Sequence, residues 1–275
     1  MKASVIHQAA RTHGRRLGAA LQQLVWKATG PLTGVALLVL CWQIGALNST
    51  VVPAPATVFG NLVDLLSSPF AVSQGQPTGL GWVLLITFKR LVAGYAVAAC
   101  CGLILGFAMG RSPFMGAILQ PLINLFRHVS PLAWLPFGLI AFSQPQAAAV
   151  WTIFICAFWP IVSATSEAIR RVPGDYLKVA RTLRLPEYKL LTRIVLPAAL
   201  PGIVGGLRHG LATAWLVIVA AELFTNSPGI GAWLRAALAD LDSTRVVTAI
   251  LVVGWVGLVL DLPLLLLRRR LLARA

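Results

Sequence analysis

Six long apolar runs, separated by short polar segments, constrain this chain more than any other feature of its sequence. A membrane-spanning helix needs about 20 mostly apolar residues, because the hydrocarbon core of a bilayer is about 30 Å thick. A spanning segment must also satisfy its own backbone N–H and C=O groups, which a helix does. The runs therefore predict an all-α, polytopic membrane protein with about six transmembrane helices. The expected spans are 31–48, 88–110, 115–143, 146–166, 203–224 and 246–267.

The third apolar run is expected to be broken rather than straight. It contains two prolines within HVSPLAWLP, residues 128–136. A proline inside a helix removes one backbone hydrogen bond and its ring clashes with the preceding turn. We therefore expect a break near these residues.

Composition agrees with a membrane protein. Only 11% of the residues are charged and 58% are hydrophobic, whereas about a quarter of the residues in a soluble domain are charged. The chain has 23 Lys and Arg against 8 Asp and Glu. Such an excess also occurs in nucleic-acid-binding proteins, but basic residues concentrate on the cytoplasmic loops of membrane proteins. We attribute the excess to those loops.

The distribution of basic residues predicts the orientation of the chain. If the N-terminus lies inside, the outer segments 49–87 and 143–147 contain no Lys or Arg. This asymmetry favours cytoplasmic placement of both termini. It divides the chain into a basic N-terminal tail at 1–30, a transmembrane domain at 31–267 and a basic C-terminal tail at 268–275.

The most highly charged stretch joins the fourth and fifth spans, at about 168–201. Apolar residues recur there at i, i+3, i+4 and i+7, which is one face of a helix. Pro186 is expected to end this helix, a second is expected to begin near Glu187, and Pro197 and Pro201 are expected to mark the bend into the fifth span. The apolar face consists of Tyr176, Val179, Ala180 and Leu183, and the cationic stripe beside it of Lys178, Arg181 and Arg184.

An amphipathic helix at a membrane surface either lies on lipid or docks into a partner. Anionic headgroups would account for the basic residues. They would not account for a second helix and a double-proline exit, which favour a mechanical link to the fifth span.

Charged residues inside the spans are candidates for the transport pathway, because such residues usually face a cavity or a partner. Arg127 lies beside the expected helix break and offers a positive charge to an anion, although an ion pair or a helix-end position is an alternative. Arg208 is expected to reach the interface and Asp261 to pair with a basic residue. The candidate pathway residues are Arg90, Arg127 and Glu222.

Glycines recur at every fourth residue in two spans, at 102, 106 and 110 and at 202, 206 and 210. Such a stripe lets helix backbones approach closely. Packing within the chain is the simpler interpretation, and a dimer face is the alternative.

The stretch KVARTLRLPEYKLLTRIVLP resembles the loop signature of permease subunits of bacterial ABC importers. Ile194, Leu196 and Pro197 match the end of that signature, whereas Lys178 replaces its Glu and Arg184 its Gly. Arg also replaces this Gly in the nitrate branch of the family. Further stretches resemble the same branch, at 68–82, 122–142, 158–162 and 206–223.

The resemblance implies a type I (MetI-like) permease fold and a membrane subunit that imports a small anion. Nitrate is the expected cargo, with nitrite, cyanate or bicarbonate as close alternatives and taurine or another sulfonate as a further one. It implies two cytoplasmic ATPase subunits, an extracytoplasmic solute-binding protein and a second permease copy as partners. The coupling role falls on Tyr176, Lys178, Val179, Ala180, Arg181, Thr182, Leu183, Arg184 and Pro197.

Energy must come from a partner, because the sequence contains no Gly-x-x-x-x-Gly-Lys-Ser/Thr loop to hold ATP phosphates. We therefore expect no cofactor on this subunit, with ATP and Mg used by the ATPase. A secondary transporter driven by an ion gradient is the alternative of another class, but it would need coupling carboxylates near the midplane. No cluster of catalytic residues or metal ligands suggests a membrane enzyme.

Overall fold

The computed structural model describes most of the chain and divides it into two compact units. The units are Met1–Asn61 and Leu62–Ala275. The expected basic tail at 1–30 lies outside the described residues except for its last two. The described residues are 29–30, 32–49, 51–73, 76–77, 79–225 and 227–273.

The first unit contains the helix Leu32–Leu47. At 1.5 Å per residue this helix is about 24 Å long, which is shorter than the hydrocarbon core of a bilayer. Trp42 of this helix contacts the residues that follow it: its Nε1 donates a hydrogen bond to Pro53 O at 3.0 Å, and its ring centroid lies 6.3 Å from that of Phe59. The helix α2 (Pro55–Ser67) begins in this unit and ends in the next.

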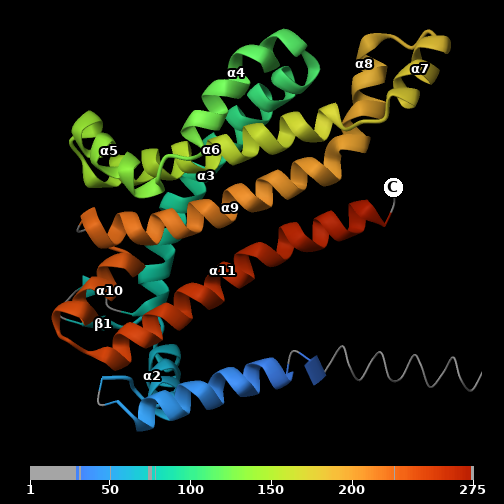
Figure 1. Cartoon of the computed structure of the whole chain (residues 1–275). Helices are drawn as coiled ribbons and strands as arrows, with labels where there is room; N and C mark the ends of the chain where they lie inside the picture. The colour runs from blue at the N-terminus through green and yellow to red at the C-terminus, as the bar shows by residue number, and fades with distance from the viewer. Residues whose placement is uncertain are drawn as a thin grey trace, which may run out of the picture. The chain divides into compact units, whose positions relative to one another are not determined.

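The second unit is built mainly of helices (Figure 1). Two strands of two residues each, Val72–Ser73 and Gln76–Pro77, form a small antiparallel pair before them. The elements after this pair are α3 (Leu80–Arg111), α4 (Pro113–Phe126), the 3₁₀ turn η1 (Pro131–Ala133), α5 (Trp134–Phe142), α6 (Pro145–Arg170), α7 (Gly174–Thr182), α8 (Glu187–Leu190), the π-helix η2 (Leu191–Val195), α9 (Leu196–Thr225), α10 (Ile230–Ala239) and α11 (Ser243–Leu272).

Four helices of the described residues are long and apolar enough to cross a membrane. The pair α4 and η1–α5 is bent by 88° and gives a fifth span if it is counted as one. This bend confirms the break expected near residues 128–136. The count stays below the six expected, because the described helix in the first apolar run is too short.

Helix α6 lies between α3 and α9, and both glycine stripes pack against it. A Cβ atom at Gly102 would lie 2.9 Å from Ile161 Cγ2, and one at Gly106 would lie 2.7 Å from Thr165 Cβ. On α9, a Cβ atom at Gly202 would lie 2.6 Å from Ala168 Cβ. The stripes therefore serve close packing within the chain.

Two helices differ from the expected boundaries. Helix α3 begins at Leu80 rather than near 88, so Arg90 lies inside it and not at its end. Pro197 and Pro201 do not interrupt the fifth span, which runs without a break from Glu187 to Thr225. The irregularity precedes Pro197 as the π-helix η2, where Leu196 N–H donates to Leu191 O, five residues back.

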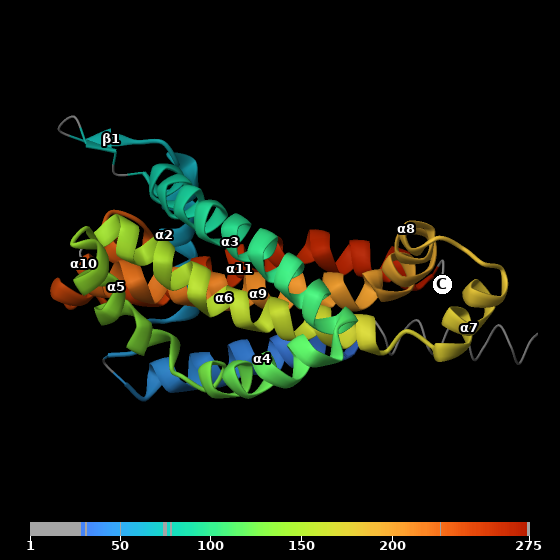
Figure 2. The same ribbon diagram turned by 90° about the horizontal axis from the view of Figure 1, so that it is seen from above.

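The two ends of the long helices carry different elements. Figures 1 and 2 both show α7 and α8 at one end of α9, and α5 and α10 at the other. A protein that binds α7 would therefore lie at the opposite end of α9 from α10.

Candidate functional site

The segment 174–190 consists of two short helices and the turn between them, and we call it the elbow. Helix α7 spans Gly174–Thr182 and α8 begins at Glu187, directly after Pro186. Both helices and the start of the second agree with the sequence-based expectation. Lys178 Nζ lies 3.0 Å from Asp175 Oδ1 in an exposed ion pair on the first turns of α7.

The turn of the elbow places Arg184 in a left-handed backbone conformation, with φ of 47°. Leu185 N–H donates to Ala180 O at 3.1 Å, which is the hydrogen bond of a Schellman helix end. Glycine normally occupies this position, because other residues lose about 1–2 kcal/mol in it. The conformation explains why Gly stands here in the general loop signature, and it shows that this chain keeps an arginine at a backbone cost.

The apolar face of α7 divides into an inner and an outer part. Ala180 is only 1% exposed and belongs to an apolar cluster with Ile169, Leu190 and Val195. Tyr176, Val179 and Leu183 are all exposed. Ala180 therefore holds α7 against the rest of the chain, while the other three side chains form an outer apolar strip. Thr182 and Arg184 are also exposed; the side chain of Arg181 lies outside the described part.

The elbow contacts two spans. It continues through η2 into α9, where Pro197 occupies the first turn. It also meets the end of α3, because Arg111 Nη2 lies 2.7 Å from Glu187 Oε2. A displacement of the elbow would consequently reach α3 as well as α9.

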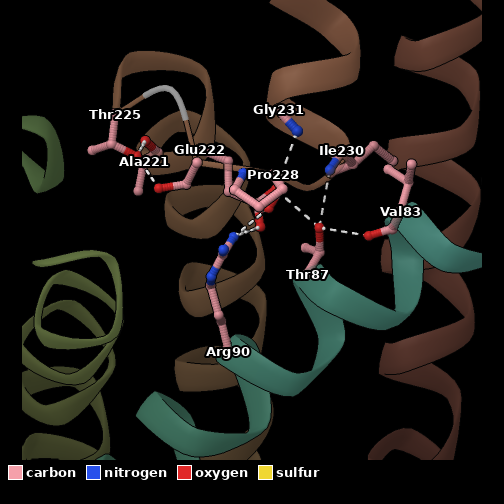
Figure 3. A network of polar contacts seen from close by, with 10 residues as sticks. Val83, Thr87, Arg90, Ala221, Glu222, Thr225, Pro228, Ile230 and Gly231 are labelled. Carbon is pink, nitrogen blue, oxygen red and sulfur yellow. Dashed lines mark hydrogen bonds and ion pairs between the residues drawn. The ribbon is translucent and has the colours of Figure 1, made fainter. Parts of the chain in front are cut away.

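The candidate pathway residues Arg90 and Glu222 form a buried ion pair with each other, 2.8 Å apart (Figure 3). Their side chains are 8% and 0% exposed, respectively. Glu222 Oε2 accepts hydrogen bonds from Thr87 Oγ1 at 2.9 Å and from Gly231 N–H at 3.1 Å. We call this arrangement the sealed pair.

The sealed pair fastens the turn between α9 and α10. Arg90 Nη1 also donates to Pro228 O at 2.5 Å, and Ile230 N–H donates to Thr87 Oγ1 at 3.0 Å. Gly229 has φ of 148°, a conformation that L side chains rarely adopt. Three elements, α3, α9 and α10, are thereby joined by one group of hydrogen bonds, as Figure 3 shows.

Arg127, the third candidate pathway residue, lies apart from the sealed pair. It caps the C-terminus of α4 at the break before η1, where Phe126 stacks on Trp159 with ring centroids 5.0 Å apart. Arg127 is exposed, and none of the described carboxylates lies within ion-pair distance of it.

A second ion pair, which we call the open pair, joins the middle of α9 to α11. Arg208 Nε and Nη2 donate to the two carboxylate oxygens of Asp261, each at 2.5 Å. The side chains are 33% and 30% exposed and line a cavity of about 580 Å³ between the two helices. The expectation that Asp261 pairs with a basic residue is confirmed: its partner is Arg208, which also lines this cavity.

Sequence reasoning did not single out Thr87 or Arg268. Thr87 lies one helical turn before Arg90, so their shared face was a usable signal. Arg268 lines the cavity of the open pair but belongs in the sequence to a run of three arginines. Among the described residues, no group of His, Cys, Asp and Glu is arranged to hold a metal ion.

Comparisons with known proteins agree with this architecture. The model of a family described as "binding-protein-dependent transport system inner membrane component" matches residues 98–273. The chain is 38% identical to the bicarbonate transport system permease protein CmpB of Synechococcus elongatus over 84% of each chain. It is 35% identical to the nitrate import permease protein NrtB of Leptolyngbya laminosa, over 92% of this chain and 91% of the relative.

A solved structure shares this fold. A chain of the inward-facing MetNI methionine ABC transporter superposes with a TM-score of 0.58 at 16% identity, covering 69% of this chain and 96% of that one. The chain therefore belongs to the family of inner membrane components of binding-protein-dependent transport systems. It is an all-α, multi-pass inner membrane protein of the MetI type, and a permease subunit rather than an enzyme.

Proposed function

We propose that this chain is the membrane subunit of an ATP-driven importer for a small inorganic anion of the nitrate and bicarbonate class, and that a cytoplasmic ATPase moves it through the elbow. The names of relatives that match most of the chain support the cargo class. The observation that carries the coupling role is the exposed apolar strip of α7 beside a left-handed Arg184.

The proposed mechanism begins at the elbow. Tyr176, Val179 and Leu183 insert into a groove of the ATPase, where burial of their apolar surface supplies binding energy. Lys178, Arg181, Thr182 and Arg184 set register and specificity through polar contacts. Ala180 keeps α7 attached to the permease, so that the elbow moves as one body.

Motion of the elbow reaches the spans by two routes. One runs through η2 and Pro197 into α9, and the other through the Arg111–Glu187 ion pair into α3. At the far end of α9 the sealed pair ties these two helices to α10. ATP and Mg are used by the ATPase, and this chain binds neither.

In this proposal the pathway charge for the anion is Arg127, because its guanidinium has no carboxylate partner among the described residues. The charges of Arg90 and Glu222 compensate each other, and the pair acts on the pathway by holding the turn between α9 and α10. The assembly contains a second copy of this chain, two ATPase subunits and an extracytoplasmic solute-binding protein. Both termini and the elbow are cytoplasmic, with basic tails at 1–30 and 268–275 on either side of a transmembrane domain at 31–267.

Two measurements test the coupling role. Leu183→Glu should abolish co-purification of the ATPase while the chain still inserts into the membrane. Leu238→Glu is the matched control, since Leu238 is also an exposed leucine but lies on α10 at the other end of α9 (Figure 1). Equal ATPase recovery with both variants would contradict the proposal.

Orientation and cargo are tested separately. In a background without Cys41, Cys100, Cys101 and Cys156, Thr182→Cys should react with a membrane-impermeant reagent only in inside-out vesicles. Uptake of labelled nitrate, bicarbonate and taurine by cells with and without the gene identifies the cargo. If the gene increases uptake of taurine but not of nitrate or bicarbonate, the proposed cargo class is wrong, while the proposed coupling role is unaffected.

A further inference from the structure

The cavity between α9 and α11 is apolar on most of its surface but contains an excess of positive charge. Three of its lining positions are glycines, Gly205, Gly254 and Gly257, which leave room between the helices. Its ionised side chains are Arg208, Asp261 and Arg268, and His209 also lines it. The apolar lining consists of Leu211, Ala212, Trp215, Leu216, Val253, Leu258 and Leu260.

The charges in the cavity do not cancel. The charge of Asp261 is compensated by Arg208, which donates to both of its carboxylate oxygens. Arg268 forms no hydrogen bond or ion pair with any described residue. Its guanidinium lies across Gly205, with Nε 3.5 Å from where a Cβ atom would stand. Arg268 is exposed, and its positive charge is not balanced by any carboxylate among the described residues.

The unused groups around the cavity are hydrogen-bond donors. Arg208 engages Asp261 through Nε and Nη2, which leaves Nη1 free. The Arg268 guanidinium offers all its donors. Arg268 belongs to α11 and meets α9 at Gly205, which is three residues before Arg208. Residues three apart lie on the same face of a helix, so both guanidinium groups lie along this face of α9. Two guanidinium groups and one carboxylate leave a net charge of one, which matches a singly charged oxyanion.

We infer that this cavity is a binding site for a monovalent oxyanion, held between Arg208 Nη1 and the guanidinium of Arg268. Asp261 is a positioning residue, because its two hydrogen bonds fix the plane of the Arg208 guanidinium. A dissolved small anion and the phosphodiester of a phospholipid offer the same chemistry. The inference goes beyond the proposed function, since it concerns equilibrium binding to this chain and holds whichever solute the importer carries.

The test is the saturable stabilisation of the purified full chain by an anion. The midpoint of thermal unfolding is measured against increasing sodium nitrate, sodium bicarbonate or sodium phosphate, with sodium gluconate keeping the ionic strength constant. Arg268→Gln should weaken the apparent affinity at least tenfold. Arg270→Gln is the matched control, because Arg270 is an exposed arginine of the same helix that does not line the cavity, and it should leave the affinity unchanged.

A second variant tests whether the free volume of the cavity, and not only its charge, is needed for binding. A Cβ atom at Gly254 would meet nothing within 4 Å, so Gly254→Leu should fill the cavity without moving the backbone and should also abolish the stabilisation. This variant keeps all three ionised side chains.

A measurement of bound phospholipid shows whether the oxyanion is a lipid phosphate or a dissolved anion. Retained phosphatidylglycerol is measured by native mass spectrometry in the same variants. If dissolved anions have no effect, but Arg268→Gln and Gly254→Leu each lower the amount of retained phosphatidylglycerol, the site binds a lipid phosphate. If neither dissolved anions nor phospholipid depend on Arg268, or if Arg270→Gln has the same effect, the inference is overturned.

Discussion

The sealed pair and the open pair place the same chemistry in two different surroundings. Both join an arginine to a carboxylate, and both have one member on α9, about 21 Å apart at 1.5 Å per residue. In the sealed pair Glu222 is 0% exposed and also accepts hydrogen bonds from Thr87 and the backbone of α10. In the open pair both side chains are about a third exposed, and a cavity adjoins them.

The difference teaches what each pair is suited to do. A buried ion pair is poor evidence of added stability, but the loss of one partner leaves an uncompensated charge. The sealed pair therefore acts as a fastener that fixes three helices in one arrangement. The open pair has room for a further ligand and leaves donors unused, so it is suited to binding. Breaking each pair in turn should separate these roles.

The largest effect is expected from Glu222→Gln. This substitution leaves Arg90 buried without a negative partner, and the loss of one member of a buried pair costs about 3–5 kcal/mol. The variant should unfold at a much lower temperature in detergent than the wild type. The double variant Arg90→Met with Glu222→Gln removes both charges and should recover part of that loss. A double variant less stable than Glu222→Gln alone would show that the pair is not the origin of the effect.

The next largest effect is expected from Gly231→Ala at the start of α10. The added Cβ atom would lie 2.5 Å from both Leu223 N and Val219 O, so the backbone of α9 or α10 must shift. Such overpacking costs about 1–3 kcal/mol. Gly254→Ala beside the open pair is the control, because its Cβ atom would meet nothing within 4 Å. Thermal unfolding of the two variants should differ, and equal midpoints would contradict the contrast between a tight and a roomy region.

Thr87→Val should give a smaller loss at the sealed pair. The valine keeps the shape of the side chain, but it removes the hydrogen bond to Glu222 and leaves Ile230 N–H without its acceptor. Unsatisfied buried groups of this kind cost about 1–3 kcal/mol. Thr87→Ser retains the hydroxyl group and should stay close to the wild type in thermal unfolding. If Thr87→Ser destabilises as much as Thr87→Val, the methyl group matters as much as the hydroxyl group, and the hydrogen bonds alone do not account for the role of Thr87.

The sequence was sufficient for the architecture because long apolar runs permit few structures in a membrane. It placed the break after α4, the two helices of the elbow and the start of α8 at Glu187. It did not place the start of α3, since LGWVLLIT (residues 80–87) was assigned to an outer segment that lacks basic residues. It also assigned the bend before the fifth span to two prolines. The π-helix η2 instead lies before them, in a stretch that carries no local breaker signal.

The site was harder to predict because its partners are far apart in the chain. Arg90 and Glu222 are separated by 132 positions, and no local pattern specifies which charges meet across that distance. Ala180 shows the same limit on a smaller scale. Periodicity grouped it with Tyr176 and Val179, but only packing against Leu190 and Val195 decides that Ala180 points inward. The periodicity of a short helix identifies an apolar face and leaves its partner undetermined.

The smallest effect is expected from Asp261→Asn in the open pair. Arg208 loses its counter-charge, but its side chain is a third exposed to the cavity, where water or an anion can take the place of the carboxylate. Exposed ion pairs contribute roughly 0.2–1 kcal/mol, so thermal unfolding should change little at low salt. Because Asp261 no longer fixes the plane of the Arg208 guanidinium, the apparent affinity for nitrate should fall, although one negative charge leaves the cavity. A loss of stability as large as that of Glu222→Gln would show that the open pair fastens α9 to α11 in the way that the sealed pair fastens α10, and the contrast between the two pairs would fail.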